Sequence, residues 1–368
     1  MLTLSQLNCE EIMIKRPTPQ NWIEELKEYH SPQIDVEVRL NTNESPIPPP
    51  EEFFQALTEG VRSLALNRYP DRSADLLCRK LSDSYNLDEK KVFVANGSNE
   101  VIQNLLLCYG GAGRSMLVFE PTYAMHSQIA RTTGTQVING KRDENFNLPS
   151  GEVVDLIRKS LPSLIFLCSP NNPTGTLISS GLIDEVLEVV GEYGGLVVVD
   201  EAYSHFGSTS FVDRVSENAS LVVVRTFSKT WAMAGIRLGY LLGPSWCVRD
   251  LEKVVLPYHL SSVSQLAGSL ALEYRSAMEA RVSSLISERE RMAEQLGKLE
   301  VVLWPSSANF ILFRAKNVPG HKVWRGLLDS GVLIRDCSTW KGLEDCLRVT
   351  VGTEYENDRF LDALKEAL

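Results

Sequence analysis

The sequence predicts an α/β fold, with a large domain built on a mostly parallel sheet flanked by helices and a smaller α+β domain. Three observations support this prediction. Short apolar runs rich in β-branched residues, typical of strands buried on both faces, recur along the chain. Each run is followed by a turn of small or polar residues and then by a helical apolar pattern, as in βαβ units. Beyond about residue 299 the composition shifts to short strands with two helices.

The large domain contains most of the predicted elements. Apolar spacing predicts helices over 51–66 and 73–85, and then a strand at 92–95 followed by a helix from 99 to 109. Four more buried strands are expected at 115–120, 163–168, 195–200 and 221–226, and one further strand is expected at 237–243. A helical pattern with charged residues outside, from about 262 to 299, predicts a long helix that links two lobes.

The small domain is expected to contain both ends of the folded chain. Its C-terminal strands are predicted at 301–304, 308–313, 332–336 and 346–352, with helices at 321–331 and 354–367. We expect the strand 38–40 to join them, after a polar arm that carries one short helix near 20–28. We therefore predict an N-terminal arm at 1–35 and a large domain at 51–270. A small domain that closes on substrate combines 36–50 with 271–368.

Composition narrows the class of protein. The net charge of −10 disfavours non-specific binding to nucleic acid, and no nucleic-acid-binding motif is present. The seven cysteines are scattered without a C-x-x-C pair, which favours reduced thiols in the cytoplasm. No signal peptide and no apolar run of membrane-spanning length is found, so we expect no membrane contact. The five histidines show no metal-binding spacing, so no metal is expected.

Lys229 is the residue around which the chemistry is organised. It follows the apolar run 222–224, so it lies just past the C-terminal end of a strand, the edge where open α/β sheets bind ligands. A lysine there can form a Schiff base with an aldehyde, while Ser228 and Arg237 hold a phosphate beside it. The aldehyde that carries a phosphate is pyridoxal 5′-phosphate. The alternative is a surface lysine in a loop, with Arg237 in a salt bridge.

Other strand ends offer polar or aromatic groups at the same edge. The turn at Ser98 and Asn99 exposes backbone N–H groups to an anion, although most such turns only cap a helix. Tyr123 is placed to stack on a flat heterocycle or to pack in the core. Further candidates, each with a chemical role left open by the sequence, are the amide of Asn172, the carboxylate of Asp200 with Tyr203 three residues later, and the amides of Asn41 and Asn43.

The joint order of these motifs resembles the fold-type I pyridoxal-phosphate aminotransferases, and within them the branch that acts on histidinol phosphate. The motifs that carry the resemblance include LNTNESP (40–46), SPNNPTG (169–175), VVDEAY (198–203), RTFSK-x7-RLGY (225–240) and CLRVTVG (346–352). They cover nearly the whole chain beyond the first 35 residues. Ser98 and Asn99 depart from the commoner acidic residue in their turn, but donation by the backbone N–H groups does not depend on the side chain.

The resemblance implies a role for each cofactor residue. Lys229 holds the cofactor and then moves a proton between the substrate Cα and the cofactor. Asp200 pairs with the pyridine nitrogen, so that the ring acts as an electron sink. Tyr203 and Asn172 contact the phenolic oxygen, and Tyr123 stacks on the ring face. The phosphate is bound by Ser228, Arg237, Ser98 and Asn99. Tyr69 matches a tyrosine that reaches the cofactor phosphate of the other subunit, which implies a homodimer with shared active sites.

The resemblance also implies how substrates are selected. Arg348 matches the arginine that forks a substrate α-carboxylate, and Arg335 matches the residue that meets the substrate phosphate. For both, the alternative is a structural ion pair. Asn43 and Tyr29 of the arm are further substrate-binding candidates. The implied reaction is reversible transamination between L-histidinol phosphate and 2-oxoglutarate, giving imidazole-acetol phosphate and glutamate, in histidine biosynthesis.

Three alternatives remain open at this point. Two keep the cofactor and change the substrate, namely an aromatic amino-acid aminotransferase and a decarboxylase of a phosphorylated amino acid. The third is a non-catalytic regulator built on an aminotransferase domain. Such a regulator needs an attached DNA-binding module, for which about 35 polar N-terminal residues are too few, and the intact Lys229 also speaks against it.

Overall fold

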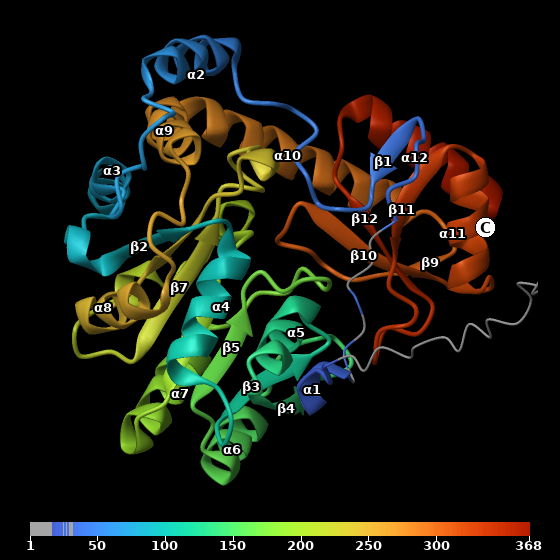
Figure 1. Ribbon diagram of the computed structural model, residues 1–368. Helices are drawn as coiled ribbons and strands as arrows, with labels where there is room; N and C mark the ends of the chain where they lie inside the picture. The colour runs from blue at the N-terminus through green and yellow to red at the C-terminus, as the bar shows by residue number, and fades with distance from the viewer. Residues whose placement is uncertain (1–16, 25, 27, 29–31) are drawn as a thin grey trace, which may run out of the picture.

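The computed structural model describes residues 17–24, 26, 28 and 32–368 and contains two sheets with the helices packed around them (Figure 1). The seven-stranded sheet has the order β2-β8-β7-β6-β5-β3-β4. Its strands are β2 (Val92–Ala95), β3 (Ser115–Glu120), β4 (Gln136–Lys141), β5 (Leu164–Cys168), β6 (Leu196–Asp200), β7 (Leu221–Thr226) and β8 (Gly239–Leu242). All neighbouring pairs are parallel except those of β8, which runs antiparallel to β7 and β2. The predicted mostly parallel sheet is therefore confirmed.

Helices cover both faces of this sheet, which explains why its strands are apolar throughout. In β6, Val197 and Val199 join the apolar cluster on one face and Val198 joins the cluster on the other, because side chains alternate along a strand. The first cluster packs against α3 (Asp75–Tyr85), α6 (Ser150–Ser160), α7 (Ser180–Tyr193) and α9 (Ser262–Ala271). The second packs against α4 (Ser98–Tyr109), α5 (Ala124–Thr132) and α8 (Ser245–Val254).

The five-stranded sheet is built from the two ends of the described chain. Its order is β1-β11-β12-β10-β9, with β1 (Val38–Leu40), β9 (Val301–Leu303), β10 (Phe310–Ala315), β11 (Val332–Asp336) and β12 (Cys346–Thr350). Strand β1 pairs in parallel with β11, so the expectation that 38–40 joins the C-terminal strands is confirmed. Helices α11 (Gly320–Asp329) and α12 (Glu354–Ala367) pack on this sheet, and a capping box at Thr353 and Glu356 begins α12.

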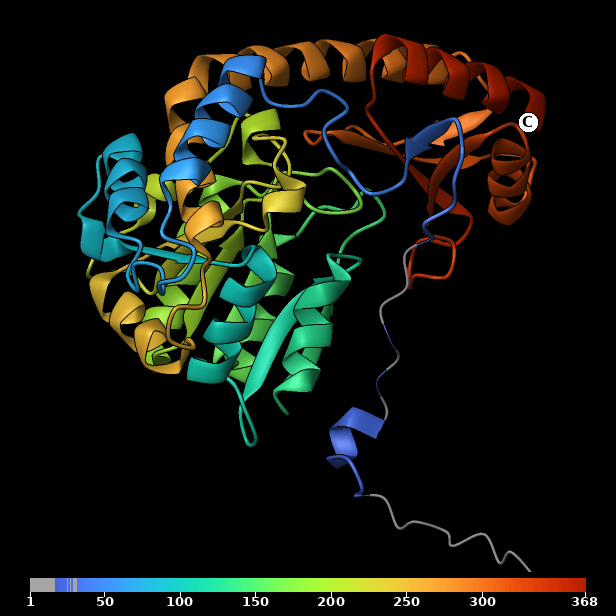
Figure 2. The same ribbon diagram turned by 45° about the horizontal axis from the view of Figure 1, so that its top comes forward.

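The connection between the sheets differs from the predicted single long helix. Helix α9 ends at Ala271, a 3-10 turn (Leu272–Tyr274) follows, and α10 (Arg275–Leu296) then runs over both sheets (Figure 2). Tyr274 explains the turn, because its hydroxyl donates to the Glu52 carbonyl and its ring packs edge-on against Phe53. Both contacts are with α2 (Glu51–Ser63), the first helix of the seven-stranded unit.

Two further elements differ from the sequence analysis. Strand β4 was not predicted, because it is an edge strand whose sequence QVINGK buries only Gly140. The helix expected near 20–28 is α1 (Asn21–Glu24), and part of the remaining range lies outside the described residues. The other short 3-10 turns are η1 (Glu89–Lys91), η2 (Ser204–Phe206), η3 (Val212–Arg214) and η4 (Ala234–Ile236).

No helix in the described ranges is both long and apolar enough to cross a membrane. The six cysteines within those ranges are free thiols.

Candidate active site

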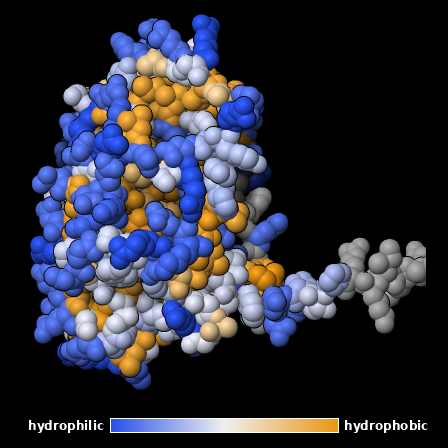
Figure 3. All heavy atoms as spheres, turned by 60° about the vertical axis from the view of Figure 1, so that its left-hand side comes forward, coloured by the Kyte–Doolittle hydropathy of each residue, from blue (hydrophilic) through white to orange (hydrophobic). Residues whose placement is uncertain are grey.

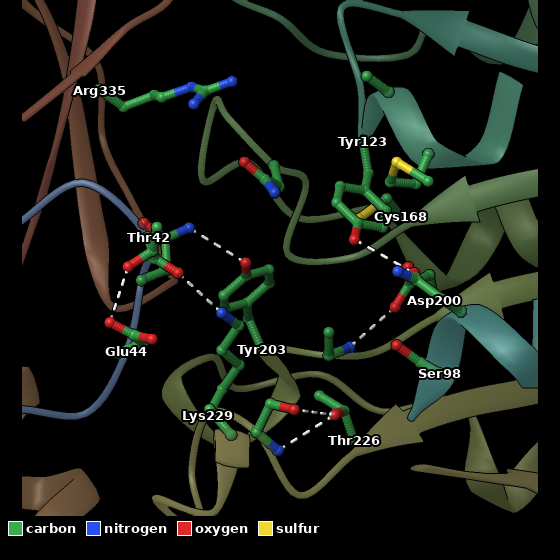
Figure 4. A pocket seen from close by; sticks show the side chains of 18 of the residues that line it. Thr42, Glu44, Ser98, Tyr123, Cys168, Asp200, Tyr203, Thr226, Lys229 and Arg335 are labelled. Atoms are coloured by element: carbon green, nitrogen blue, oxygen red, sulfur yellow. Dashed lines mark hydrogen bonds between the residues drawn. The ribbon is translucent and has the colours of Figure 1, made fainter. Parts of the chain in front are cut away.

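A cavity of about 420 Å³ lies between the two sheets, at the C-terminal ends of β5, β6 and β7 and the N-terminal end of α4 (Figure 4). It is lined by thirteen of the residues singled out in the sequence: Asn41, Asn43, Ser98, Asn99, Tyr123, Asn172, Asp200, Tyr203, Ser228, Lys229, Arg237, Arg335 and Arg348. Parallel strands bring their carboxyl ends to one edge, so residues far apart in the sequence meet there. The predicted convergence of the strand ends is therefore confirmed.

Lys229 lies in the turn after β7, and its Nζ donates a hydrogen bond to the carbonyl oxygen of Thr42 at 2.9 Å. The pKa of this amine is lowered to about 8, mainly by burial and also by the cations of Arg348 and Arg237, whereas Glu44 opposes the shift. The cavity therefore contains an amine that loses its proton far more readily than an ordinary lysine. A neutral amine is the form that attacks a carbonyl and accepts a proton.

Asp200 ends β6 with its carboxylate almost fully buried. Its Oδ2 lies 2.9 Å from Nε2 of His126, and its Oδ1 accepts the backbone N–H of Ala202 at 3.1 Å. Because a carboxylate accepts, Nε2 carries the proton, and Nδ1 of His126 has no hydrogen-bond partner among the described residues. No local pattern in the sequence indicated a site role for His126, which the structure places directly behind the carboxylate.

Tyr203 and Asn43 join the two sheets across the cavity. Asn43 Nδ2 donates to the hydroxyl of Tyr203 at 3.1 Å, and Thr350 Oγ1 of β12 donates to Asn43 Oδ1 at 3.1 Å. The Asn43 carbonyl accepts from the side chain of Asn309 at 3.2 Å. Burial raises the pKa of Tyr203 to about 12, although Arg348 and the Asn43 hydrogen bond act against it, so the hydroxyl keeps its proton at neutral pH.

An anion-binding cradle lies at the start of α4. The backbone N–H groups of Ser98 and Asn99, in the first turn, have no partner within the helix and carry its positive dipole end. Opposite them, the Ser228 hydroxyl accepts from Thr226 Oγ1 at 3.0 Å and from Arg237 Nη1 at 3.4 Å.

Two glycines let these groups approach one another. Gly97 has φ +84°, and a β-carbon there would lie 2.6 Å from Arg237 Nη2. A β-carbon on Gly239 would lie 2.3 Å from the backbone nitrogen of Ser98. A side chain at Gly97 would displace the guanidinium, and one at Gly239 would push the helix start away from β8, so the cradle requires glycine at both positions.

Arg335 and Arg348 face each other on adjacent strands of the small sheet. They are direct cross-strand partners in the β11–β12 ladder, so both side chains lie on the same face of the sheet. Arg348 is buried, and its guanidinium donates to Asn172 Oδ1 at 2.6 Å and to the Asn41 carbonyl at 2.8 Å. Arg335 extends from its strand toward the cavity (Figure 4). Like charges placed opposite each other repel, so this arrangement favours an anion between or beside them.

A buried ion pair fixes the strand ends behind the site. Glu201, the residue after Asp200, accepts from Arg225 of β7 at 2.6 and 3.0 Å. Arg225 also donates to the hydroxyl of Tyr85 at 2.9 Å, so the buried guanidinium is paired as well as hydrogen-bonded. Such a pair holds β6 and β7 in register next to Asp200 and Lys229.

Several cavity residues escaped the sequence analysis. Thr42 and Glu44 belong to the motif LNTNESP, which is the signal that would have indicated them. Cys168 ends β5 and is the cross-strand partner of Asp200. Trp340 lies in the loop between β11 and β12, where no pattern in the sequence pointed to it.

Among the described residues, one predicted site residue does not line this cavity. Tyr69 is 80% exposed and stacks on Tyr258, with ring centroids 4.5 Å apart. Tyr29 lies outside the described residues.

The family model described as aminotransferase class I and II matches residues 35–364. Histidinol-phosphate aminotransferase of Frankia casuarinae is 42% identical over 355 residues, which cover 93% of this chain and 88% of that protein. The enzyme of the same name from Corynebacterium efficiens is 41% identical, over 92% of this chain and 91% of that protein.

Solved structures show the same similarity. The histidinol-phosphate aminotransferase of Clostridium acetobutylicum superposes with a TM-score of 0.83 at 26% identity, over 89% of this chain and 98% of that chain. That of Sinorhizobium meliloti, solved with pyridoxal 5′-phosphate, has a TM-score of 0.86 at 18% identity, over 96% of this chain and 98% of that chain.

Proposed function

This chain belongs to the class I and II aminotransferases, and from that premise we propose that it transfers an amino group between L-histidinol phosphate and 2-oxoglutarate, with pyridoxal 5′-phosphate as cofactor. The family assignment supports the reaction type. The names of the relatives and the arginine pair of the small sheet support the substrates.

The donor set of the cavity fits the cofactor. The amine of Lys229, with its lowered pKa, suits the aldehyde of pyridoxal phosphate. The buried carboxylate of Asp200 suits the ring nitrogen, and the anion-binding cradle at the start of α4 suits the phosphate. The close approach at Gly97 supports the same fit, because a side chain there would occupy the position of the Arg237 guanidinium. When bound, this cofactor supplies an electron sink for the carbanion formed at the substrate α-carbon.

Each catalytic residue then has a task that follows from its surroundings. Lys229, whose amine is readily neutral, removes the proton from the substrate α-carbon and returns it to the adjacent acceptor carbon. Asp200, oriented by His126, holds a proton at the ring nitrogen. Tyr203 keeps its own proton and donates toward the phenolic oxygen, with Asn172 beside it, while Tyr123 covers the ring face.

The observation that carries the substrate assignment is the arginine pair. Arg348, already aligned by Asn172 and Asn41, presents a planar fork suited to the α-carboxylate of glutamate. Arg335 adds a second cation for a substrate that carries a phosphate and no α-carboxylate. Glu44 and Asn43, on the wall that Lys229 faces, complete the polar lining on that side, and Tyr29 of the arm remains a candidate for the imidazole end.

A panel of single amino donors tests the proposal. Purified holoenzyme is mixed with one donor at a time, and the visible absorption of the bound cofactor is followed. L-histidinol phosphate and glutamate should each discharge the band, whereas phenylalanine should react much more slowly. Equal rates on phenylalanine and histidinol phosphate would instead indicate an aromatic amino-acid aminotransferase.

The arginine pair also suits a second candidate, decarboxylation of a phosphorylated amino acid. Arg335 and Arg348 would then take the phosphate and the carboxylate of one substrate. An L-threonine-O-3-phosphate decarboxylase of Porphyromonas gingivalis shares the fold, with a TM-score of 0.78 at 22% identity. Release of CO2 from such substrates, with no transfer to 2-oxoglutarate, would select this function.

We also propose a homodimer with shared active sites, in the cytoplasm. Leu66, Tyr69 and Leu256 are each more than two-thirds exposed, and Tyr258 stacks on Tyr69. They lie in the connection that precedes α3 and in the one that follows α8, on a side of the molecule where apolar surface gathers (Figure 3). An aromatic hydroxyl on such a surface is placed to reach into a neighbouring subunit.

Mixing two inactive variants tests the shared site. Tyr69→Ala should weaken cofactor binding and Lys229→Ala should abolish the reaction, but in a mixed dimer one site keeps both residues. Unfolding and refolding the two together should restore about a quarter of the wild-type activity, because half of the dimers are mixed and each has one intact site. Activity that stays at the level of the separate variants, with dimers present by light scattering, would show that Tyr69 acts within its own subunit.

A further inference from the structure

Trp340 lies beside the arginine pair of the small sheet. It is in the loop between β11 and β12, five residues after Arg335, and it lines the cavity. The guanidinium carbon of Arg335 lies 5.6 Å from the centre of the Trp340 ring, over its face. At this distance a guanidinium is attracted to the negative face of an indole, which is the strongest aromatic partner for a cation.

The Trp340 ring is supported from behind. It packs against a small apolar cluster made of Phe146, Leu312, Cys337, Leu343 and Cys346. The turn that carries it is closed by backbone hydrogen bonds, from Trp340 N–H to the Cys337 carbonyl at 2.9 Å and from Leu343 N–H to the Trp340 carbonyl at 3.0 Å. The ring is therefore a fixed surface, whereas an arginine side chain by itself has many rotamers.

The same loop meets the opposite wall of the site. Gly342 has φ +78°, and a β-carbon there would lie 3.8 Å from Cδ of Pro121. Pro121 precedes Tyr123, the aromatic residue at the start of α5. The loop with Trp340 thus comes close to the seven-stranded unit, next to the segment that carries the cavity residue Tyr123.

Attractive contacts on each side oppose the repulsion between Arg348 and Arg335. Arg348 is aligned by two oxygen acceptors, Asn172 Oδ1 and the Asn41 carbonyl. Arg335 stands opposite it with the same charge, so repulsion tends to drive the two guanidinium groups apart. The face of Trp340 is an attractive surface on the Arg335 side that opposes this repulsion.

We propose that Trp340 is a positioning residue that holds the Arg335 guanidinium in the cavity and thereby sets the preference of the enzyme for phosphate-bearing substrates. The inference rests on the proposed function, in which Arg335 meets the substrate phosphate. Holding the guanidinium in place before binding reduces the entropy lost on binding, so the effect belongs in KM for the phosphorylated substrate. Glutamate, which carries no phosphate and is bound through Arg348, is affected much less.

Two substitutions and a matched control test this role. Trp340→Leu keeps an apolar side chain but removes the aromatic face, and should raise KM for histidinol phosphate about five- to thirtyfold while changing KM for glutamate less than about twofold. Trp340→Phe should recover part of the loss. The control is Trp304→Leu, because Trp304 packs on the same apolar cluster and has Arg314 over its ring at 5.8 Å, but does not line the cavity. It should leave the ratio of the two KM values unchanged.

The outcomes separate this inference from the proposed function. If Trp340→Leu raises both KM values by the same factor, or changes neither, Trp340 does not position Arg335 for phosphate. A crystal structure of Trp340→Leu gives a readout without substrate, since Arg335 should leave its position, and a guanidinium that stays in place would overturn the inference. If the wild type does not react with histidinol phosphate, the proposed function fails, and the Arg335 position in that crystal structure still decides the role of Trp340.

Discussion

The chemistry of the site depends on one amine whose surroundings change its acidity. Lys229 is buried and lies near two guanidinium groups, so its pKa falls from the ordinary lysine value to about 8. Below this pH the amine is protonated and cannot attack an aldehyde, and above it the neutral form dominates. The apoenzyme should therefore capture pyridoxal phosphate at a rate that rises with pH, with its midpoint near 8.

The neighbours of Lys229 allow a test with opposite signs. Glu44 raises the pKa of Lys229 and Arg348 lowers it. Glu44→Gln should shift the midpoint of the capture rate to lower pH, and Arg348→Gln should shift it to higher pH. Stopped-flow absorbance over pH 6–10, a range of about two units on either side of the expected midpoint, measures both. A midpoint near 10 in the wild type would contradict the assigned environment.

The sequence identified most individual site residues but not all their partners. Lys229 follows an apolar strand and Asp200 ends one, which is a local signal, whereas Arg348 lies in the middle of β12 and was indicated by the resemblance of its motif. The contacts of Lys229 with Thr42 and of Asp200 with His126 join segments far apart in the chain, and no local pattern encodes such pairs. Trp340 was missed for the same reason, since its role depends on where a loop lies relative to Arg335.

At the scale of elements, the cradle depends on two backbones that approach closely. Residue Ala95 of β2 pairs with Gly239 of β8, and this pairing places the start of α4 against β8. Gly239→Ala would put a methyl group 2.3 Å from the Ser98 nitrogen, so the helix start must shift. We expect a loss of stability of roughly 1–3 kcal/mol and weaker cofactor binding, measured by urea unfolding and by absorbance titration.

Gly191→Ala provides the control for this substitution. Gly191 lies within α7, and a β-carbon there meets no atom within 4 Å. Alanine should stabilise this helix by about 0.5–1 kcal/mol and leave cofactor binding unchanged. Equal effects of the two substitutions would show that the cradle does not depend on the close approach at Gly239.

The sequence predicted buried elements well and edge elements poorly. Strands such as β6 are apolar throughout because both faces are covered, so they are recognisable from composition alone. Strand β4 lies at the edge of the sheet and its sequence QVINGK is mostly polar, so its composition gives no such signal. The break between α9 and α10 depends on Tyr274 reaching α2, a tertiary contact that helical periodicity does not contain.

At the scale of the whole molecule, Asn43 connects the two sheets. Its side chain bonds to Tyr203 on one side and to Thr350 on the other, and its backbone has φ +55°, a conformation that asparagine and glycine tolerate best. Asn43→Ala removes both hydrogen bonds and adds strain, so it should destabilise the protein by about 2–4 kcal/mol. Asn43→Gly removes the bonds alone and should cost about 1–2 kcal/mol.

Hydrogen exchange shows whether this loss is local or concerns the link between the sheets. In Asn43→Ala, the amides of β12 should exchange faster, while those of β6, in the centre of the other sheet, should keep their protection. This difference between the two sheets is expected if the chain divides into a large domain (51–270) and a small domain (36–50 with 271–368), as the sequence predicts. Uniform loss of protection in both sheets would indicate a single cooperative unit instead.

Because β1 pairs with β11, the five-stranded sheet can form only late in the synthesis of the chain. The ribosome releases β1 first and its partner strand only after every strand of the other sheet has emerged. A nascent chain that has reached β8 already contains the lysine and the phosphate cradle, but neither arginine that would retain a substrate. Translation that stops before Val332 thus yields a product whose first strand has no partner and which lacks Arg335 and Arg348, the two arginines proposed to bind substrate.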